Sequence, residues 1–194
     1  GFYLGAWGST IKWIKDAAAT TGETKGSVEL DLYGGYKFEA AGLGFDVGYL
    51  RYQYVGNSLK NSTSNAGPYV NANTDEVYGA ATYGVTTLKY SYATSDLFGY
   101  TNSNGSTYWD LSATFDIGNG YSLVPHAGRQ EVKNHAANSY TDVALTLNKD
   151  LGDGLTASVA AIRTNRKGDT NFASNLTSYD TAKNTLVVGV KYGF

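Results

Sequence analysis

The final eleven residues, 184–194, alternate between apolar and polar positions as the residues of an extended strand do. Every second residue from Leu186 onward is apolar, and the series closes with two aromatic residues, Tyr192 and Phe194. The opposite face is small or charged, includes Lys191, and has Val187 as its exception. Successive side chains of a strand point to opposite sides, so this segment has one oily and one polar face. A strand of about ten residues with this pattern is typical of a closed barrel that crosses a bilayer.

The same period of two recurs along the chain and predicts ten strands. Residues 27–39 show it most cleanly, with Leu30 and Leu32 on one face and Glu29 and Asp31 on the other. Polar segments rich in Asn, Ser and Gly separate several of the strands and are typical of loops. The predicted strands are residues 2–10, 27–39, 43–54, 75–84, 87–95, 107–117, 121–132, 140–151, 155–164 and 184–194.

Two of these strands contain a residue that disturbs the pattern. In the third strand the apolar series changes phase after Tyr49. This predicts either a β-bulge that keeps Arg51 away from lipid or a position for Arg51 above the membrane. In the seventh strand Pro125 cannot donate to the strand ladder, so a bulge or interrupted pairing is expected there.

The connections between the predicted strands alternate in length. Links after the second, fourth, sixth and eighth strands are tight, whereas links after the odd-numbered strands are longer. All tight turns then lie at one end, as in outer-membrane barrels with short periplasmic turns and longer extracellular loops. We therefore expect one all-β domain over residues 1–194, an antiparallel transmembrane β-barrel of ten strands.

Composition narrows the classes of function. The 194 residues include no cysteine, which excludes a disulfide framework and a cysteine-based metal site. The net charge of −2 gives no field that attracts nucleic acid, so we expect no nucleic-acid partner. The 24 glycines and 17 tyrosines suit strands that meet in tight turns and rings that lie at a polar–apolar boundary.

Five segments resemble the TorF family of porins, a proteobacterial family of conserved hypothetical outer-membrane proteins. They are residues 1–8 (GFYLGAWG), 29–36 (ELDLYGGY), 45–50 (FDVGYL), 76–79 (EVYG) and 88–92 (LKYSY). The terminal Phe194 also resembles the C-terminal signal of bacterial outer-membrane barrels. The resemblance covers the first half of the chain well and the second half loosely. It implies a porin-like barrel whose transported solute is not established.

Members of that family usually carry a further N-terminal hairpin before the strand that matches residues 1–8. Nothing in the sequence corresponds to this hairpin. A ten-stranded barrel, and a twelve-stranded barrel of which a part is missing from the sequence, both have an even number of strands. Both interpretations therefore remain open.

Polar faces line a lumen if the apolar faces contact lipid. The pattern places most acidic side chains in the loop-side half and Lys37, Lys89 and Lys191 in the turn-side half. Such rings of charge tune which ions enter a pore. The alternative is that these charges pair across a filled interior, since about eight strands leave room only for side chains. The predicted pore-lining residues are Glu29, Asp31, Lys37, Asp46, Glu76, Lys89, Asp110, Asp142 and Lys191.

Aromatic residues near strand ends favour girdles at the membrane interfaces over a sugar-binding platform. The predicted interface aromatics are Tyr36, Phe38, Phe45, Trp109, Phe115, Tyr192 and Phe194.

The sequence offers little for catalysis or metal binding. His126 falls on the lumen side of its strand and His135 lies in a loop, and no spacing beside either marks a nucleophile. Asp150 and Asp153 bracket a tight turn but lack the distal Glu of a calcium loop. We expect no enzyme activity, no metal and no cofactor.

The preferred interpretation is a passive channel for ions or small polar solutes in the bacterial outer membrane, with the C-terminus and short turns periplasmic. It would contact the lipid bilayer and lipopolysaccharide, with a second copy or another outer-membrane protein as a candidate partner. One alternative is a non-conducting structural or surface-binding barrel that acts through its extracellular loops. The other is a soluble ligand-binding barrel of the lipocalin type, with its apolar faces inward.

Overall fold

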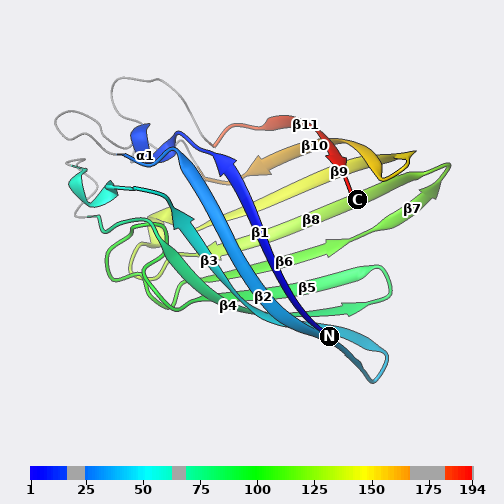
Figure 1. Cartoon of the computed structure of the whole chain (residues 1–194), viewed down its shortest axis with the longest axis horizontal. Helices are drawn as coiled ribbons and strands as arrows, with labels where there is room; N and C mark the ends of the chain where they lie inside the picture. The colour runs from blue at the N-terminus through cyan, green and yellow to red at the C-terminus, as the bar shows by residue number, and fades with distance from the viewer. Residues whose placement is uncertain (17–24, 63–68, 167–181, 194) are drawn as a thin grey trace.

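A computed structural model describes residues 1–16, 25–62, 69–166 and 182–193 and places their strands in one antiparallel sheet (Figure 1). Each strand pairs with its neighbour in sequence, which confirms the expected all-β antiparallel class. The order is β1-β2-β3-β4-β5-β6-β8-β9-β10-β11, and the short β7 pairs with β8. The strands are β1 (Phe2–Thr10), β2 (Val28–Ala40), β3 (Leu43–Tyr54), β4 (Thr74–Tyr83), β5 (Thr86–Ala93), β6 (Thr107–Ala113), β7 (Phe115–Gly118), β8 (Tyr121–Glu131), β9 (Tyr140–Gly152), β10 (Leu155–Thr164) and β11 (Thr185–Tyr192).

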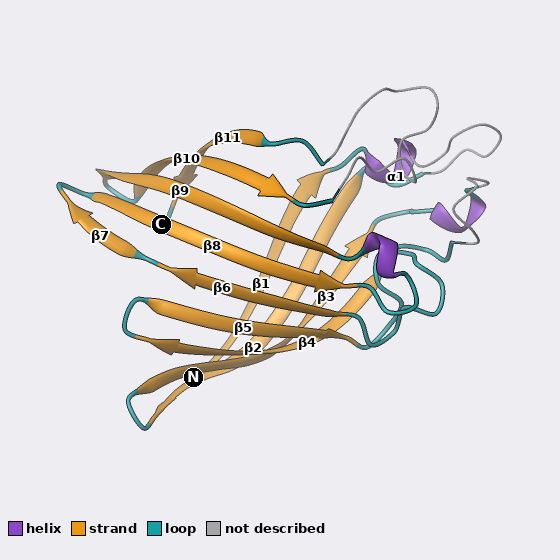
Figure 2. Cartoon of the chain, turned by 180° about the vertical axis from the view of Figure 1, so that it is seen from behind, coloured by secondary structure: helices purple, strands orange, loops and turns teal. Residues whose placement is uncertain are grey.

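The sheet curls, so that β1, β2 and β3 form one wall and β8, β9 and β10 form the opposite wall (Figures 1 and 2). β1 and β11 are the two ends of the strand order, and no pairing joins them within the described residues. Helical structure there is limited to α1 (Trp13–Asp16) and the two 3₁₀ turns Leu59–Asn61 and Ala136–Asn138. None of the described helices has the length and apolar character needed to cross a membrane.

All tight turns lie at one end of the sheet and the longer loops gather at the other end, as the link lengths predict (Figure 2). Three of the turns combine a non-glycine residue and a glycine with positive φ angles, which match the twist of hairpin strands. Asn119 and Gly120 form one of these turns, with φ angles of 53° and 74°.

Two local details differ from the sequence pattern or refine it. The predicted strand 107–117 is divided into β6 and β7 at Thr114, and the break lies beside Pro125 of β8. The proline thus lies where pairing is interrupted, one of the two expected outcomes. The proposed bulge in β3 is wrong, because the register runs without a shift through Tyr49 and Arg51 on both sides of the strand.

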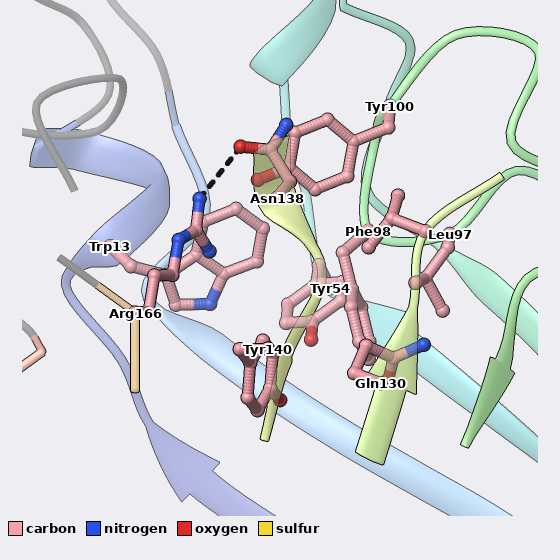
Figure 3. A pocket seen from close by; sticks show the side chains of 10 residues that line it. Trp13, Tyr54, Leu97, Phe98, Tyr100, Gln130, Asn138, Tyr140 and Arg166 are labelled. Carbon is pink, nitrogen blue, oxygen red and sulfur yellow. Dashed lines mark hydrogen bonds between the residues drawn. The ribbon is translucent and has the colours of Figure 1, made fainter. Parts of the chain in front are cut away.

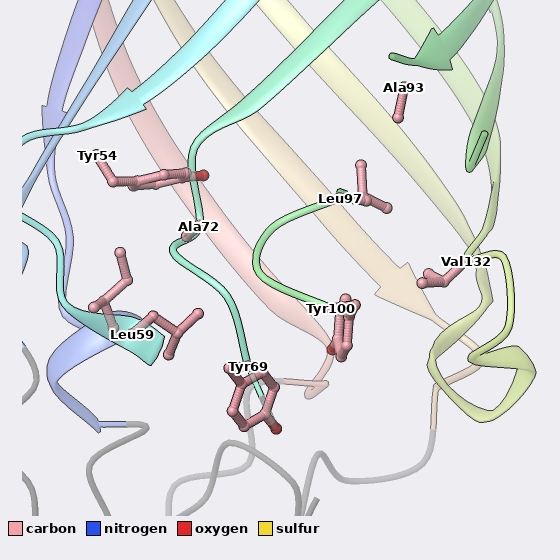
Figure 4. Close-up of a cluster of buried hydrophobic side chains, with 9 residues drawn as sticks. Tyr54, Leu59, Tyr69, Ala72, Ala93, Leu97, Tyr100 and Val132 are labelled. Atoms are coloured by element: carbon pink, nitrogen blue, oxygen red, sulfur yellow. The ribbon is translucent and has the colours of Figure 1, made fainter. Parts of the chain in front are cut away.

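The apolar faces of the strands point outward. Leu32, Val47 and Leu145 are examples of large side chains that remain exposed on the outer surface. This orientation is opposite to that of a lipocalin, whose apolar faces line the interior. The buried hydrophobic cluster instead lies at the loop end (Figure 4), and it consists of Ile14, Tyr54, Leu59, Tyr69, Ala72, Ala93, Leu97, Tyr100 and Val132.

Candidate functional site: the interior and its mouth

Polar side chains of strands that are not neighbours meet across the concave side of the sheet. The Tyr3 hydroxyl of β1 is hydrogen-bonded to the Tyr78 hydroxyl of β4, although β2 and β3 lie between these strands. The Tyr108 hydroxyl of β6 donates to Asp142 Oδ2 of β9 over 3.1 Å, across the intervening β8. Contacts of this kind form only on the inside of a curled sheet, so the polar face is the inner face.

The nine predicted pore-lining residues all fall on this inner face by strand register. Their separation into an acidic loop-side half and a basic turn-side half is wrong at the level of Lys89 and Asp110, however. Lys89 lies directly opposite Asp110 in the β5–β6 register. Lys37 Nζ lies 3.9 Å from Asp46 Oδ2 near the turn end. Charges of both signs therefore lie at the same height along the strands. The reason is that the β5–β6 register places the middle of β5 beside the middle of β6.

A first cavity of about 330 Å³ lies in the turn-side part of the interior, and it is lined by Tyr3, Asp31, Tyr33, Lys37, Asp46, Leu50, Tyr78 and Lys89. The ammonium group of Lys89 lies 4.2 Å from the centre of the Tyr78 ring, a cation–π contact. Asp31 Oδ1 is buried and has no hydrogen-bond partner among the described residues. A carboxylate oxygen in this state is an acceptor for a cation or for a donor group of a solute.

A second cavity of about 290 Å³ lies in the middle of the interior, and it is lined by Tyr52, Glu76, Lys89, Ser91, Phe98, Tyr108, Asp110, Gln130 and Tyr140. These residues come from six strands and one loop, which places the cavity on the axis of the curled sheet. Lys89 lines both this cavity and the turn-side cavity.

A third cavity of about 300 Å³, here called the vestibule, lies at the loop end and is lined by Trp13, Tyr54, Leu97, Phe98, Tyr100, Gln130, Val132, Asn138, Tyr140 and Arg166 (Figure 3). It shares Phe98, Gln130 and Tyr140 with the middle cavity. The three cavities thus follow one another from the loop end to the turn end, with shared side chains between them.

His126 lies among acidic groups on the inner face. Its Nε2 is 3.2 Å from Asp110 Oδ2, and its Nδ1 is 3.5 Å from Asp142 Oδ1. Tyr108 joins the same group through Asp142. A nucleophilic triad requires a hydroxyl or thiol hydrogen-bonded to the imidazole, and within the described residues no serine or threonine hydroxyl is hydrogen-bonded to His126. The cluster is therefore a charged network of the inner face.

His135 lies at the loop end, as the sequence indicates. Its Nε2 is 2.8 Å from the Thr101 carbonyl oxygen, and its ring lies 5.3 Å from the ring of Tyr100. These contacts give it a structural role in joining two loops. Within the described parts of the chain, no group of three or more His, Asp or Glu side chains is placed to hold a metal ion.

The predicted interface aromatics lie on the outer face in two levels. Near the turn end, the Phe38 and Phe45 rings are stacked with centres 5.1 Å apart, and Tyr36 lies 6.0 Å from Phe38. Phe115 and Tyr192 are at the same end, on β7 and β11. Trp109 lies farther toward the loops, 4.5 Å from Tyr90. Phe194 is outside the described residues.

Sequence reasoning missed the vestibule because its lining residues come from segments far apart in the chain. Trp13 belongs to α1, Phe98 to a loop, and Arg166 follows β10. Arg166 Nη2 donates to Asn138 Oδ1 over 2.8 Å, which ties two loop segments together. The tyrosines at strand ends were the available signal, since Tyr54 ends β3 and Tyr140 begins β9, both at the loop end.

These features define an all-β protein whose single curled sheet has an apolar outer face and a charged, tyrosine-rich inner face. The chain belongs to the family described as "Bacterial protein of unknown function (Gcw_chp)", whose model matches residues 1–194. No curated protein and no solved structure matches the chain. The family description assigns no activity.

Proposed function

We propose that the chain forms a closed β-barrel in the bacterial outer membrane and acts as a passive channel for ions or small polar solutes. The observation that carries this proposal is the series of three cavities on the inner face, from the vestibule through the middle cavity to the turn-side cavity. Charged and polar side chains along such a path replace part of the hydration of a passing solute.

The membrane location is supported by the outer face. It is a band of apolar side chains with aromatic residues toward the strand ends, which is the composition of a lipid-facing barrel surface. Arg51 on the outer face is bound through Nη1 to Asp75 Oδ1 over 2.8 Å, near the loop end. We place this ion pair above the hydrocarbon, because a lipid-facing charge at mid-depth costs about 2–4 kcal/mol.

The proposed orientation puts the tight turns and the C-terminus in the periplasm and the longer loops outside, where they meet lipopolysaccharide. The sequence resemblance to TorF-family porins agrees with this placement. A second copy of the chain, or another outer-membrane protein, remains a candidate partner.

The inner face favours cations. Six of the nine predicted pore-lining residues are acidic and three are lysines. Asp31 also presents a carboxylate oxygen that has no hydrogen-bond partner among the described residues. An excess of carboxylates along a pore raises the local concentration of cations. We therefore expect a cation preference in the conducted ions.

Planar-bilayer recording tests the channel directly. We expect defined conductance steps with a cation preference that weakens when Asp31→Asn and Asp110→Asn are combined. Asp153→Asn is the matched control, because it removes one carboxylate from a turn tip whose positive φ asparagine tolerates. A cation preference that Asp153→Asn weakens as much as the double variant does would contradict the assignment of the lining residues.

A non-conducting barrel that acts through its extracellular loops is the second candidate. The Tyr3–Tyr78 contact crosses the interior, and the buried hydrophobic cluster packs beneath the loops at the mouth. Tyr3 and Tyr78 line the turn-side cavity, and part of the hydrophobic cluster lines the vestibule, so both features occupy space in the interior. The same recording decides between the candidates, because a folded and inserted protein that gives no conductance steps would exclude the channel.

A further inference from the structure

The vestibule has a mainly aromatic wall with one charged side chain, Arg166, whose guanidinium group donates to Asn138. The rings of Trp13 and Tyr54 meet edge to face, with centres 5.2 Å apart. Phe98 lies edge to face with Tyr54 at 6.4 Å. These contacts hold three rings from separate parts of the chain in fixed positions, and Tyr140 completes the wall (Figure 3). A preformed aromatic pocket loses little freedom when it binds a flat apolar molecule.

One hydrogen-bond acceptor, on a largely buried side chain, lies between the vestibule and the middle cavity. Gln130 is only 6% exposed and lines both cavities. Its Nε2 donates to the Thr107 carbonyl over 2.9 Å, which fixes the amide group. Its Oε1 accepts no hydrogen bond from the described residues. The oxygen is therefore open to a donor, and a ligand that supplies one there gains a hydrogen bond within the cavity.

Size and polarity restrict the ligand. A dry cavity of about 150 Å³ lined by apolar side chains accepts benzene, so the vestibule, at about 300 Å³, has room for a substituted single ring. A sugar carries hydroxyl groups around its whole rim and would leave several of them against Leu97 and Val132 without partners. A flat ring with a single hydroxyl group matches the wall better.

We propose that the vestibule binds small neutral aromatic molecules that carry one hydrogen-bond donor, with phenol as the simplest case. The ring packs among Trp13, Tyr54, Phe98 and Tyr140, and the hydroxyl donates to Gln130 Oε1. This inference rests on the proposed function, since it names the class of solute that the channel collects at its outer mouth.

Fluorescence of the full-length chain in detergent micelles tests the site. Trp13 lies in the vestibule, whereas Trp7 is on the inner face of β1 and Trp109 is on the outer face. In a Trp7→Phe, Trp109→Phe background, Trp13 is the remaining tryptophan and reports binding. We expect a saturable change in its fluorescence with phenol, beyond that of free tryptophan in empty micelles. A change that does not saturate would overturn the proposal.

Gln130→Leu separates the hydrogen bond from the aromatic contact. Loss of one neutral hydrogen bond should weaken phenol binding by about three- to tenfold. Toluene has the same ring without the donor, so its affinity should be unchanged or slightly higher. Gln53→Leu is the matched control, because Gln53 is on the outer face and contacts Arg51. Equal effects of Gln130→Leu on phenol and toluene would remove the role assigned to Gln130.

Channel recording makes the two proposals separable. Phenol added on the loop side should lower the step conductance of the unmodified protein, and Gln130→Leu should reduce this effect. A phenol titration that changes neither the step conductance nor the Trp13 fluorescence would overturn the aromatic site. That result would not contradict the channel. Saturable phenol binding in a protein without conductance steps would overturn the channel and with it the assignment of phenols as transported solutes.

Discussion

Tyrosine rings lie against glycine backbones at several positions of the inner face. The rings of Tyr33 and Tyr108 lie over Gly5 and Gly128 of other strands. A Cβ atom added at Gly128 would lie 2.6 Å from Tyr108 Cζ and 2.7 Å from Asp142 Oδ2. Glycine at such positions lets a ring lie flat against the neighbouring backbone, which fills the interior with fixed side chains.

Gly128→Ala should therefore destabilise the protein, by about 1–3 kcal/mol, because the new methyl group overpacks a site already occupied by Tyr108. Gly79→Ala is the control, since a Cβ there meets nothing within 4 Å. Reversible urea unfolding in lipid vesicles or detergent measures both. If the two variants lose the same stability, the close contact between Gly128 and Tyr108 has no energetic importance.

The alternation of residues was sufficient to assign each charged side chain to a face, but not to find its partners. Asp110 and Asp142 were predicted for the inner face, and the structure places both there. Their common contact with His126 depends on the relative register of β6, β8 and β9, which no single strand encodes. The vestibule was unpredictable for a related reason, because loop backbones bring its rings together.

At the level of strands, β1 and β11 differ from the other strands of the main order because each has one neighbour in the described sheet. Leu4 of β1 is 92% exposed and Val188 of β11 is 80% exposed. Leu32, on the same outer face of the second strand, is 45% exposed. In a bilayer the unpaired backbone groups of an edge would cost several kcal/mol each, so both edges need a partner there.

Amide hydrogen exchange tests whether these edges are covered in the membrane. If the barrel closes in lipid, the backbone amides at the free edges of β1 and β11 become paired. They should then exchange as slowly as the amides of β8 and β9. Paired amides in the middle of β8 and β9 serve as the internal reference. Rapid exchange along β1 and β11 in vesicles would contradict a closed barrel.

The strand boundaries follow the sequence pattern closely, with one instructive exception. The predicted strand 107–117 keeps its alternation through Thr114, yet the structure breaks it there. The reason lies in the next strand, where Pro125 has no amide hydrogen to offer. The bulge expected in β3 is absent for a similar reason, since the cause lies in a neighbouring strand. Asp75 of β4 forms an ion pair with Arg51, so the charge is accommodated on the outer face without a change of register.

For the whole molecule, the apolar surface band predicts how the protein behaves in solution. We expect that it requires detergent for extraction, because soluble proteins rarely expose apolar patches larger than a few hundred Å². Centrifugation of cell envelopes with and without detergent measures this. Release of the folded protein into a detergent-free buffer would contradict the membrane assignment.

The order of the sheet has a consequence for assembly. Because every strand of the main order pairs with the one before it, a barrel can form one strand at a time, and each step closes only the loop between two successive strands. The sole distant encounter in a sealed cylinder would be the last one, between the first and final strands. Docking of those two strands, rather than the search for partners elsewhere, should then set the pace at which the protein matures.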